Sequence, residues 1–248
     1  MFFSPSDIIA FMQQDLFDFE KKNNIFSSQG NQKKIKWLSH SALEELHRCP
    51  RCFWLSYKEG IKLPEGIQSR LANRFDTILK KYFNNYRQKG NLPPIIADKL
   101  KGKLENPFRE RYYLKINEEY GFYGKLDECL ISEEGEYVPI DFKTASSDPR
   151  EKEILSSYQN QIDEYLFLME ENGKKVANFG YLIYFFPEMS IELTNGFPMI
   201  VHVVKIERKV KDIRKRIEAA VKILQGPIPQ SSPECVFCNW FGRVKRYY

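Results

Sequence analysis

Apolar residues recur at helical spacing near the start of the chain, where they predict an amphipathic helix over residues 1–20. Its apolar stripe consists of Ile8, Ile9, Phe11, Met12, Leu16 and Phe19. Residues 21–36 are polar and contain Gly, Ser and Asn, a composition typical of a linker. We therefore predict an N-terminal helix and linker over 1–36, followed by one domain over 37–248.

Two further helices are predicted before the middle of the chain. The first begins at Ser39 or Ser41, either of which can cap a helix, and runs to about Tyr57. The second spans about 66–88 and should end at 91–94, where Asn and Pro interrupt it. Its apolar stripe consists of Leu71, Phe75, Ile78, Leu79, Tyr82, Phe83 and Tyr86.

The second half of the chain alternates strand-like and helical patterns. Two runs with β-forming residues, 120–131 and 136–145, flank a short Gly-containing turn and predict a hairpin. The elements expected after it are a helix over about 151–171, strands over 179–186 and 199–207, and a basic helix over 208–224. This order predicts an α/β or α+β fold.

The composition narrows the class of protein. Of 248 residues, 42% are hydrophobic, 29% charged and 15% aromatic, which is globular and excludes wholesale disorder or a fibrous repeat. No apolar run approaches the ~20 residues of a membrane-spanning helix, and the first twelve residues lack the basic region of a secretory signal. We therefore expect a cytoplasmic protein with no membrane partner.

Charge is distributed unevenly along the chain. The formal net charge is +5, yet residues 205–248 alone contain 11 Lys or Arg against 4 Asp or Glu. A basic C-terminal segment favours a polyanionic partner such as nucleic acid. An ordinary solvated face is the alternative.

Four of the five cysteines form two pairs with C-x-x-C spacing, Cys49 with Cys52 and Cys235 with Cys238. Two such pairs can supply the four thiolates of one Zn²⁺ ion or of an iron–sulfur cluster. Buried free thiols or a single redox pair are the alternatives, since disulfides would need an oxidising compartment. A shared centre would join the start of the domain to its end. Cys129 has no partner at ligand spacing and is expected in the core.

The predicted hairpin carries a pair of acids. Side chains alternate faces along a strand, so Asp141 and Lys143 share one face. With a three-residue turn at 133–135, Asp127 lies opposite Asp141, and Lys125 lies opposite Lys143. Facing carboxylates repel unless a cation neutralises them, and carboxylate and carbonyl oxygens suit Mg²⁺. The pattern predicts a Mg²⁺ site with Lys143 beside a scissile phosphate; two surface aspartates paired with lysines are the alternative.

Three polar residues on the neighbouring helices extend this set. Gln161 and Tyr165 are four residues apart and project from one helix face, where they can contact phosphate or a base. A partly buried amphipathic helix would explain them equally well. Asp76 interrupts the apolar stripe of the 66–88 helix and is either a third carboxylate ligand or an exposed edge residue.

Taken together, these residues resemble the motifs of the PD-(D/E)XK nuclease superfamily over about 37–241. The resemblance is to the RecB-like branch with a four-cysteine centre, which includes AddB nuclease domains and CRISPR-associated RecB-type exonucleases. The matching motifs are Ser39-His40-Ser41-Ala42-Leu43 with Arg48-Cys49-Pro50-Arg51, Gly124-Lys125-Leu126-Asp127, Asp141-Phe142-Lys143-Thr144, and Gln161 to Tyr165. Each is short, but their order and the cysteine pairs around them make the combination specific.

The resemblance implies a restriction-endonuclease-like α/β core, in which helices flank a mixed central sheet, and metal-dependent cleavage of phosphodiester bonds. Asp127, Asp141 and the backbone carbonyl of Phe142 would bind Mg²⁺ or Mn²⁺, and Lys143 would be catalytic.

The resemblance also implies that Gln161 and Tyr165 position DNA. Relatives place a histidine ligand on the helix before the hairpin, where this chain has Asp76. Iron–sulfur members place one cysteine early and three late, whereas this chain has two and two. We expect a [4Fe-4S] cluster by resemblance, with Zn²⁺ as the alternative. The histidines are interpreted as ordinary helix and strand residues: His40, His47 and His202.

The primary functional hypothesis is a DNA nuclease, an exonuclease acting on single strands or duplex ends. Its setting would be DNA repair, recombination or CRISPR-type defence, with a helicase or an integrase-type protein as partner. The basic helix 208–224 and the tail 243–246 would follow the DNA backbone, and Trp240 and Phe241 would stack on a base. The alternatives are a nucleic-acid-binding or assembly module that does not cut, and a metal-stapled interaction protein.

Overall fold

The structure is a computed structural model that describes residues 35–63, 70–189 and 196–247. These residues belong to one compact unit, Ile35–Tyr248. The helix predicted over 1–20, and the linker after it as far as residue 34, lie outside the described residues.

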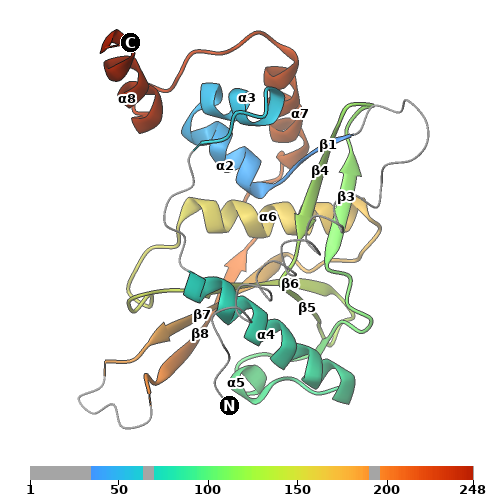
Figure 1. Cartoon of the computed structure of the whole chain (residues 1–248). Helices are drawn as coiled ribbons and strands as arrows, with labels where there is room; N and C mark the ends of the chain where they lie inside the picture. The colour runs from blue at the N-terminus through green and yellow to red at the C-terminus, as the bar shows by residue number, and fades with distance from the viewer. Residues whose placement is uncertain (1–34, 64–69, 190–195, 248) are drawn as a thin grey trace, which may run out of the picture. The chain divides into compact units, whose positions relative to one another are not determined.

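Two mixed sheets form the frame (Figure 1). The smaller has the order β1-β4-β3 and consists of β1 (Lys36–Leu38), β4 (Tyr120–Lys125) and β3 (Arg111–Lys115). Strand β4 pairs in parallel with β1 and antiparallel with β3.

The larger sheet has the order β2-β5-β6-β7-β8. Its strands are β2 (Lys103–Leu104), β5 (Glu128–Ile131), β6 (Tyr137–Thr144), β7 (Phe179–Pro187) and β8 (Met199–Glu207). The central pair, β6 and β7, is parallel, and the other pairs are antiparallel. The mixed sheet flanked by helices that the sequence predicted is therefore present.

Helices cover both faces of the larger sheet. Helix α6 (Ser156–Glu171) lies between the two sheets and contacts β3 and β4 on one side and β6 and β7 on the other (Figure 1). Helices α4 (Arg70–Lys89) and α5 (Pro94–Ala97) pack on the opposite face of the larger sheet. The remaining helices are α2 (His40–Arg48), α3 (Pro50–Lys58), α7 (Ile213–Gln225) and α8 (Val236–Val244). A 3₁₀ turn (Lys245–Tyr247) follows α8.

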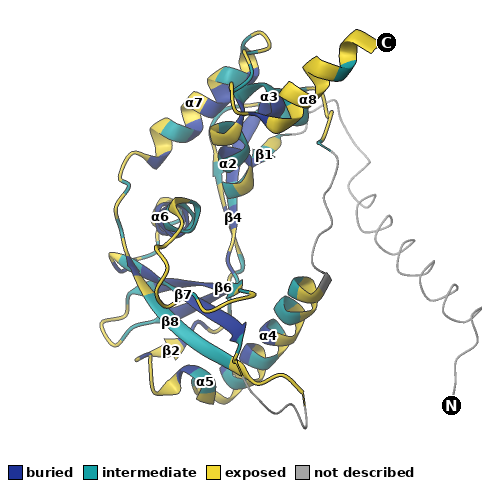
Figure 2. Cartoon of the chain, turned by 90° about the vertical axis from the view of Figure 1, so that its left-hand side faces the viewer, coloured by how far each residue is buried: buried dark blue, intermediate teal, exposed yellow. Residues whose placement is uncertain are grey.

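Strand alternation divides the core into two clusters. Along β7, Leu182 and Tyr184 belong to the cluster on the α6 side, whereas Ile183 belongs to the cluster under α4 and α5. Strand β7 is mostly buried (Figure 2), and its near-continuous apolar run follows from burial on two faces. Strand β6 is buried over Val138–Asp141. In the described part of the chain, no helix combines the length and apolar character needed to cross a membrane.

Several predicted elements have different bounds. The strand predicted over 120–131 is two strands, because the chain leaves the smaller sheet after Lys125 and enters the larger one at Glu128. The helix predicted to run to about Tyr57 is interrupted at Cys49, which is extended (φ −161°) and precedes the first residue of α3, Pro50.

Two later helices start after their predicted first residues, α6 at Ser156 and α7 at Ile213. The sequence did not predict the short strands β1, β2 and β3 or the helices α5 and α8.

Candidate functional site

Strand β6 presents Asp141 and Lys143 towards α6. Its alternate residues Val138 and Ile140 pack into the cluster under α4 and α5, so the two charged side chains take the other face, as predicted. Asp141 is buried, and its Oδ2 lies 2.7 Å from Lys143 Nζ.

The pairing of β5 with β6 brings Asp127 next to this pair. Glu128 pairs with Ile140, which is the register predicted from a three-residue turn and puts Asp127 and Asp141 at the next step. Asp127 Oδ2 accepts a hydrogen bond from the Phe142 backbone N–H at 3.0 Å. The carboxylate is thereby fixed at the start of β5 against β6.

The prediction that Lys125 faces Lys143 is wrong. Lys125 ends β4 in the smaller sheet, where it pairs with Arg111 and its Nζ lies 3.2 Å from Glu110. The reason is the change of sheet after Lys125: a continuous strand would have kept both lysines on one ladder.

A hydrogen-bonded series links β6, α6 and β4. Lys143 Nζ donates to Gln161 Oε1 (2.7 Å), and Gln161 Nε2 donates to the Tyr165 hydroxyl (2.8 Å). The Tyr165 hydroxyl lies 2.9 Å from the Lys125 carbonyl oxygen and 3.4 Å from Asp141 Oδ1. The structure therefore brings Gln161 and Tyr165 together with the acids and the lysine.

Gly124 allows α6 to approach β4 closely. A Cβ atom at this position would stand 2.8 Å from Leu168 Cδ1 and 3.1 Å from Tyr165 Cδ1. The first glycine of the G-x-x-D motif thus has a packing role, since any larger residue would push Tyr165 away from the strand.

Asp76 reaches the set through another residue. Its carboxylate lies 2.9 Å from Lys80 Nζ, and the same Nζ lies 3.2 Å from Asp127 Oδ1. Sequence reasoning missed Lys80. The only available signal was the i, i+4 spacing of Asp76 and Lys80 on one helix face.

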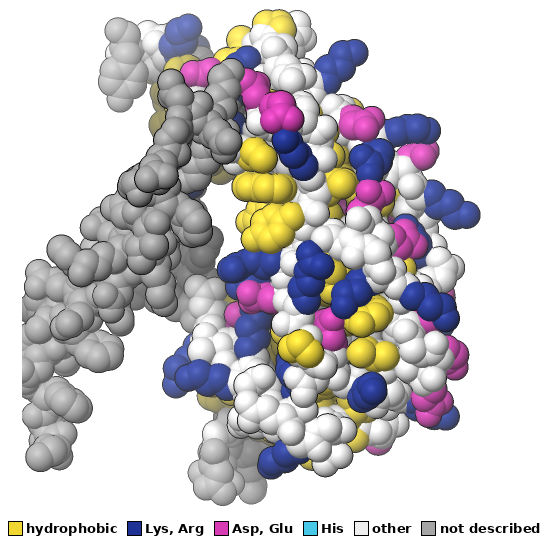
Figure 3. Space-filling view, turned by 90° about the vertical axis from the view of Figure 1, so that its right-hand side faces the viewer, with side chains coloured by type: hydrophobic (Ala, Val, Ile, Leu, Met, Phe, Trp, Pro, Cys, Tyr) yellow, Lys and Arg dark blue, Asp and Glu magenta, His cyan; other side chains and the backbone are white. Residues whose placement is uncertain are grey.

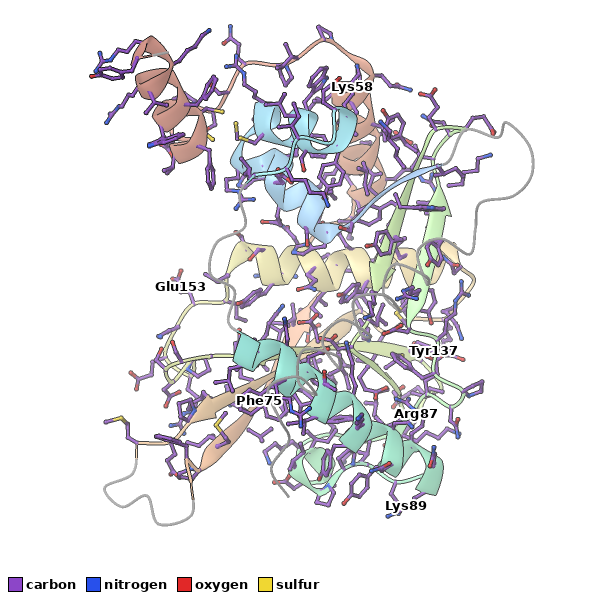
Figure 4. The ribbon with its side chains drawn as sticks, viewed as in Figure 1. Lys58, Phe75, Arg87, Lys89, Tyr137 and Glu153 are labelled. Atoms are coloured by element: carbon purple, nitrogen blue, oxygen red, sulfur yellow. The ribbon has the colours of Figure 1, made fainter. Side chains whose placement is uncertain are left out.

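A buried ion pair anchors α4 beside Asp127. Arg87 (labelled in Figure 4) donates to both carboxylate oxygens of Glu128, at 3.0 and 2.6 Å, and to the Glu105 carbonyl oxygen at 2.7 Å. Because Glu128 follows Asp127 directly, this pair fixes the start of β5 relative to α4.

His40 lies on α2, as expected, and its side chain makes a contact that the sequence did not predict. Its Nδ1 lies 2.9 Å from Oε2 of Glu164, a carboxylate that is 1% exposed on α6. Burial raises the pKa of Glu164, and the His40 contact opposes that rise. The pair ties α2 to α6 at the residue directly before Tyr165.

Burial also governs the electrostatics of the acids. It raises the pKa of Asp141 from 3.8 to about 6, while the Lys143 ammonium opposes the rise and the charge of Asp127 adds to it. The pKa of Tyr165 lies well above its usual value, first because of burial and then because both carboxylates are near.

The donor set suits a hard divalent cation. Asp141 stands on β6, Asp127 directly precedes the neighbouring strand β5, and the Phe142 carbonyl belongs to the residue between Asp141 and Lys143. Such oxygens are the ligands of Mg²⁺ and Mn²⁺. Asp127 adds negative charge beside the buried Asp141 carboxylate, and a bound cation would reduce the repulsion between the two.

The four paired cysteines meet in one cluster, as predicted, and their sulfurs lie within 4.8 Å of one another. Cys52 Sγ is 3.5 Å from Cys235 Sγ and 3.6 Å from Cys238 Sγ, and Cys49 Sγ is 3.9 Å from Cys238 Sγ. This group could hold a metal ion. Cys129 is buried in β5, in the core, as expected.

The basic C-terminal segment divides into two parts. Arg208 pairs with Glu170 at 2.6 Å, and Arg214 pairs with Glu171, so part of the predicted basic helix is neutralised by α6. Helix α8 has no buried residue, and Trp240 is 65% exposed. On the face shown in Figure 3, basic and acidic side chains are intermixed.

No family model matches the chain. Among solved structures, it is similar to the crystal structure of a protein named SSO0001, with 18% identity, 94% of this chain and 95% of that chain covered, and a TM-score of 0.47. That similarity identifies neither a family nor an activity.

Proposed function

We propose that this protein is a metal-dependent deoxyribonuclease of the PD-(D/E)XK type with a restriction-endonuclease-like core. One observation carries the proposal: Asp127, which directly precedes β5, accepts a hydrogen bond at 3.0 Å from the Phe142 backbone N–H beside Asp141 on β6, and the Lys143 ammonium lies 2.7 Å from Asp141. Two acids and a lysine grouped in this way suit hydrolysis of a phosphodiester.

In the proposed reaction, Asp127, Asp141 and the Phe142 carbonyl would hold Mg²⁺ or Mn²⁺, which would supply Lewis acidity and lower the pKa of a bound water. Lys143 offsets the negative charge that develops on the scissile phosphate. Gln161 accepts a hydrogen bond from Lys143, which directs the ammonium, and Tyr165 fixes the Gln161 amide from the other side.

The test is cleavage by Asp141→Ala and Lys143→Ala. Each should lower the rate on single-stranded and duplex DNA by at least about 10²-fold, as the loss of one transition-state contact does. Asp98→Ala and Lys99→Ala are matched controls, because they remove the same side chains from an exposed pair that directly follows α5. Normal cleavage by both site variants, with Mg²⁺ and with Mn²⁺, would refute the proposal.

A second candidate is a nucleic-acid-binding module of the same fold that does not cut. The contact of Asp76 with Lys80 favours it, because Asp76 stands where relatives are expected to have a metal ligand. Salt-dependent DNA binding without turnover in Mn²⁺ would support this candidate over the nuclease.

For the four-cysteine centre we propose a single Zn²⁺ ion. Four sulfurs bound at ~2.3 Å around one tetrahedral zinc stand about 3.8 Å apart; all four sulfurs here lie within 4.8 Å of one another, and three of the separations are 3.5, 3.6 and 3.9 Å. A [4Fe-4S] cluster binds each thiolate through a different iron and needs wider spacing. Metal analysis after anaerobic purification should find one zinc per chain in a colourless protein, and a brown iron-containing protein would overturn this choice.

DNA is the proposed substrate. Exposed Trp240 and Phe241 stand on α8 just before Arg243, and Lys245 and Arg246 follow. Aromatic rings with cations beside them are the groups on which single strands stack.

A further inference from the structure

Helix α4 directs an ammonium group at one of the proposed metal ligands. Lys80 Nζ lies 3.2 Å from Asp127 Oδ1 and 2.9 Å from Asp76 Oδ1, and it donates to Asp76 Oδ2 at 3.0 Å. Asp76 and Lys80 are one helical turn apart, so a single turn of α4 supplies both the ammonium and the carboxylate that holds it.

Both oxygens of Asp127 already have a partner within the protein. Oδ2 accepts from the Phe142 backbone N–H at 3.0 Å, which fixes the plane of the carboxylate. Oδ1 faces Lys80. A divalent cation bound through Oδ1 would therefore share that oxygen with the Lys80 ammonium or displace it, and one bound through the free lone pair of Oδ2 would still face the same ammonium across the carboxylate.

The position of Lys80 is set by the packing of α4. Leu79 and Phe83 on the same helix are buried in the cluster under the larger sheet, and Arg87 forms the buried pair with Glu128. Lys80 itself is 28% exposed, whereas the Asp76 side chain is 44% exposed. The anchored helix keeps the ammonium beside Asp127, and Asp76 is the more solvated member of the three.

We propose that Lys80 is an internal competitor of the divalent cation at Asp127, and that Asp76 is a positioning residue for Lys80 and not a metal ligand. This inference rests on the proposed function, because it assigns the regulation of metal affinity to the same site. A positive charge held at Oδ1 weakens the attraction of the site for a second cation. Lys80 thus sets the metal concentration at which the site fills.

The test is the Mn²⁺ affinity of the whole chain, with its cysteine centre loaded, measured from free Mn²⁺ by electron paramagnetic resonance. Lys80→Met should bind Mn²⁺ about tenfold more tightly than the wild type, since one nearby unit charge is removed. Lys81→Met is the matched control, because Lys81 is exposed on the same helix, and it should bind like the wild type. Unchanged or weaker binding by Lys80→Met would overturn the inference. Lys80→Gln repeats the measurement with a polar side chain, should the methionine variant not fold.

The part assigned to Asp76 is tested in the Lys80→Met background. If Asp76 acts through Lys80, adding Asp76→Asn there should change the Mn²⁺ affinity by less than about threefold, the effect expected of a solvated charge. If Asp76 were a ligand, the double variant would lose affinity as Asp127→Asn does.

Different results would remove the metal site and the role of Lys80. Equal Mn²⁺ binding by the wild type, Asp127→Asn and Asp141→Asn would remove the proposed metal site itself. Loss of binding in both aspartate variants, together with unchanged binding in Lys80→Met, would remove only the role of Lys80.

Discussion

The buried hydroxyl of Tyr165 has a structural role in the candidate site and no role in the chemistry. It accepts from Gln161 and lies 2.9 Å from the Lys125 carbonyl oxygen, while Gln161 accepts from Lys143. Each of these polar groups has little access to water, so each depends on its protein partner. The hydroxyl therefore fixes the Gln161 amide and, through it, the lysine.

We expect Tyr165→Phe to lose about 1–3 kcal/mol of unfolding free energy, because the partly buried Gln161 amide and Lys125 carbonyl each lose a partner. Cleavage at saturating metal should fall as well, since Gln161 no longer holds Lys143 in one place. Urea unfolding and turnover are the measurements. Tyr113→Phe, at a 44% exposed position, is the control and should change neither. A Tyr165→Phe protein as stable and active as the wild type would contradict the role of the hydroxyl.

Asp141 gives a pH dependence whose sign follows from its environment. Burial raises its pKa from 3.8 to about 6, so the folded state binds the proton more tightly than the unfolded state. Its contribution to stability is therefore complete below about pH 4 and is lost as the pH rises through about 6. The two-unit rise corresponds to about 3 kcal/mol.

Asp141→Asn does not ionise and should escape that loss. With a chelator present, the unfolding free energy of the variant relative to the wild type should rise by up to about 3 kcal/mol between about pH 4 and 7. Above about pH 7 this difference should stay constant. Urea unfolding of both proteins at a series of pH values measures the difference. A difference independent of pH would show that the carboxyl is not stabilised in its protonated form.

Local periodicity predicted part of the site. Strand alternation put Asp141 and Lys143 on one face, and i, i+4 spacing put Gln161 and Tyr165 on another. The contact of His40 with Glu164 joins residues 124 positions apart, and no local pattern reports such a pair. Lys80 was missed for the same reason, since a lysine on an amphipathic helix is ordinarily solvated.

The local sequence pattern did not predict how the strands around the site are divided between the two sheets. Residues 120–131 have a continuous strand-like pattern, yet β4 and β5 belong to different sheets. The change of sheet is stabilised by tertiary contacts: the Leu126 N–H donates to the Glu110 carbonyl at 2.8 Å. Which strands pair depends on residues elsewhere in the chain, so the sequence of residues 120–131 alone does not show where one strand ends and the next begins.

Gly124 tests the contact between α6 and β4. We expect Gly124→Ala to cost about 1–3 kcal/mol, as overpacking of a filled interior does, because the new methyl group would stand 2.8 Å from Leu168 Cδ1. Cleavage should also fall, since Tyr165 would shift from the Lys125 carbonyl. Gly242→Ala is the control: a Cβ there meets nothing within 4 Å, and alanine favours the helix. If Gly124→Ala matched the wild type in chemical denaturation and turnover, the close approach of α6 would be unimportant.

At the level of the domain, the four-cysteine centre joins segments that are 183 positions apart, as between Cys52 and Cys235. Helix α8 has no buried residue, so the centre is its main attachment. Ser232 adds one backbone N–H donated to Cys49 Sγ at 3.4 Å. By contrast, α4 and α6 are held by the two core clusters, which contain the candidate active site. The sequence predicted the link between chain ends from cysteine spacing alone, because metal ligation demands four thiolates whatever the fold between them.

Removing the metal should therefore release α8 without unfolding the sheets. Metal ligation can supply on the order of 10 kcal/mol to the structure it organises, and α8 has no core packing to replace it. In Cys238→Ser, or after chelation, we expect amide hydrogen exchange to accelerate over 236–244 while β6 and β7 keep their protection.

Cys129→Ser is a matched control, because Cys129 is buried in the core away from the centre, and it should keep the metal content and the slow exchange of α8. Two results would contradict this separation of α8 from the core. Unchanged exchange of α8 without metal would mean that contacts other than ligation hold the helix. Loss of protection throughout the sheets would mean that the core depends on the cysteine centre. The expected result would make α8 a part whose attachment, and with it the exposed Trp240 and Phe241, depends on the metal, while the acids and the lysine on the larger sheet stay in place.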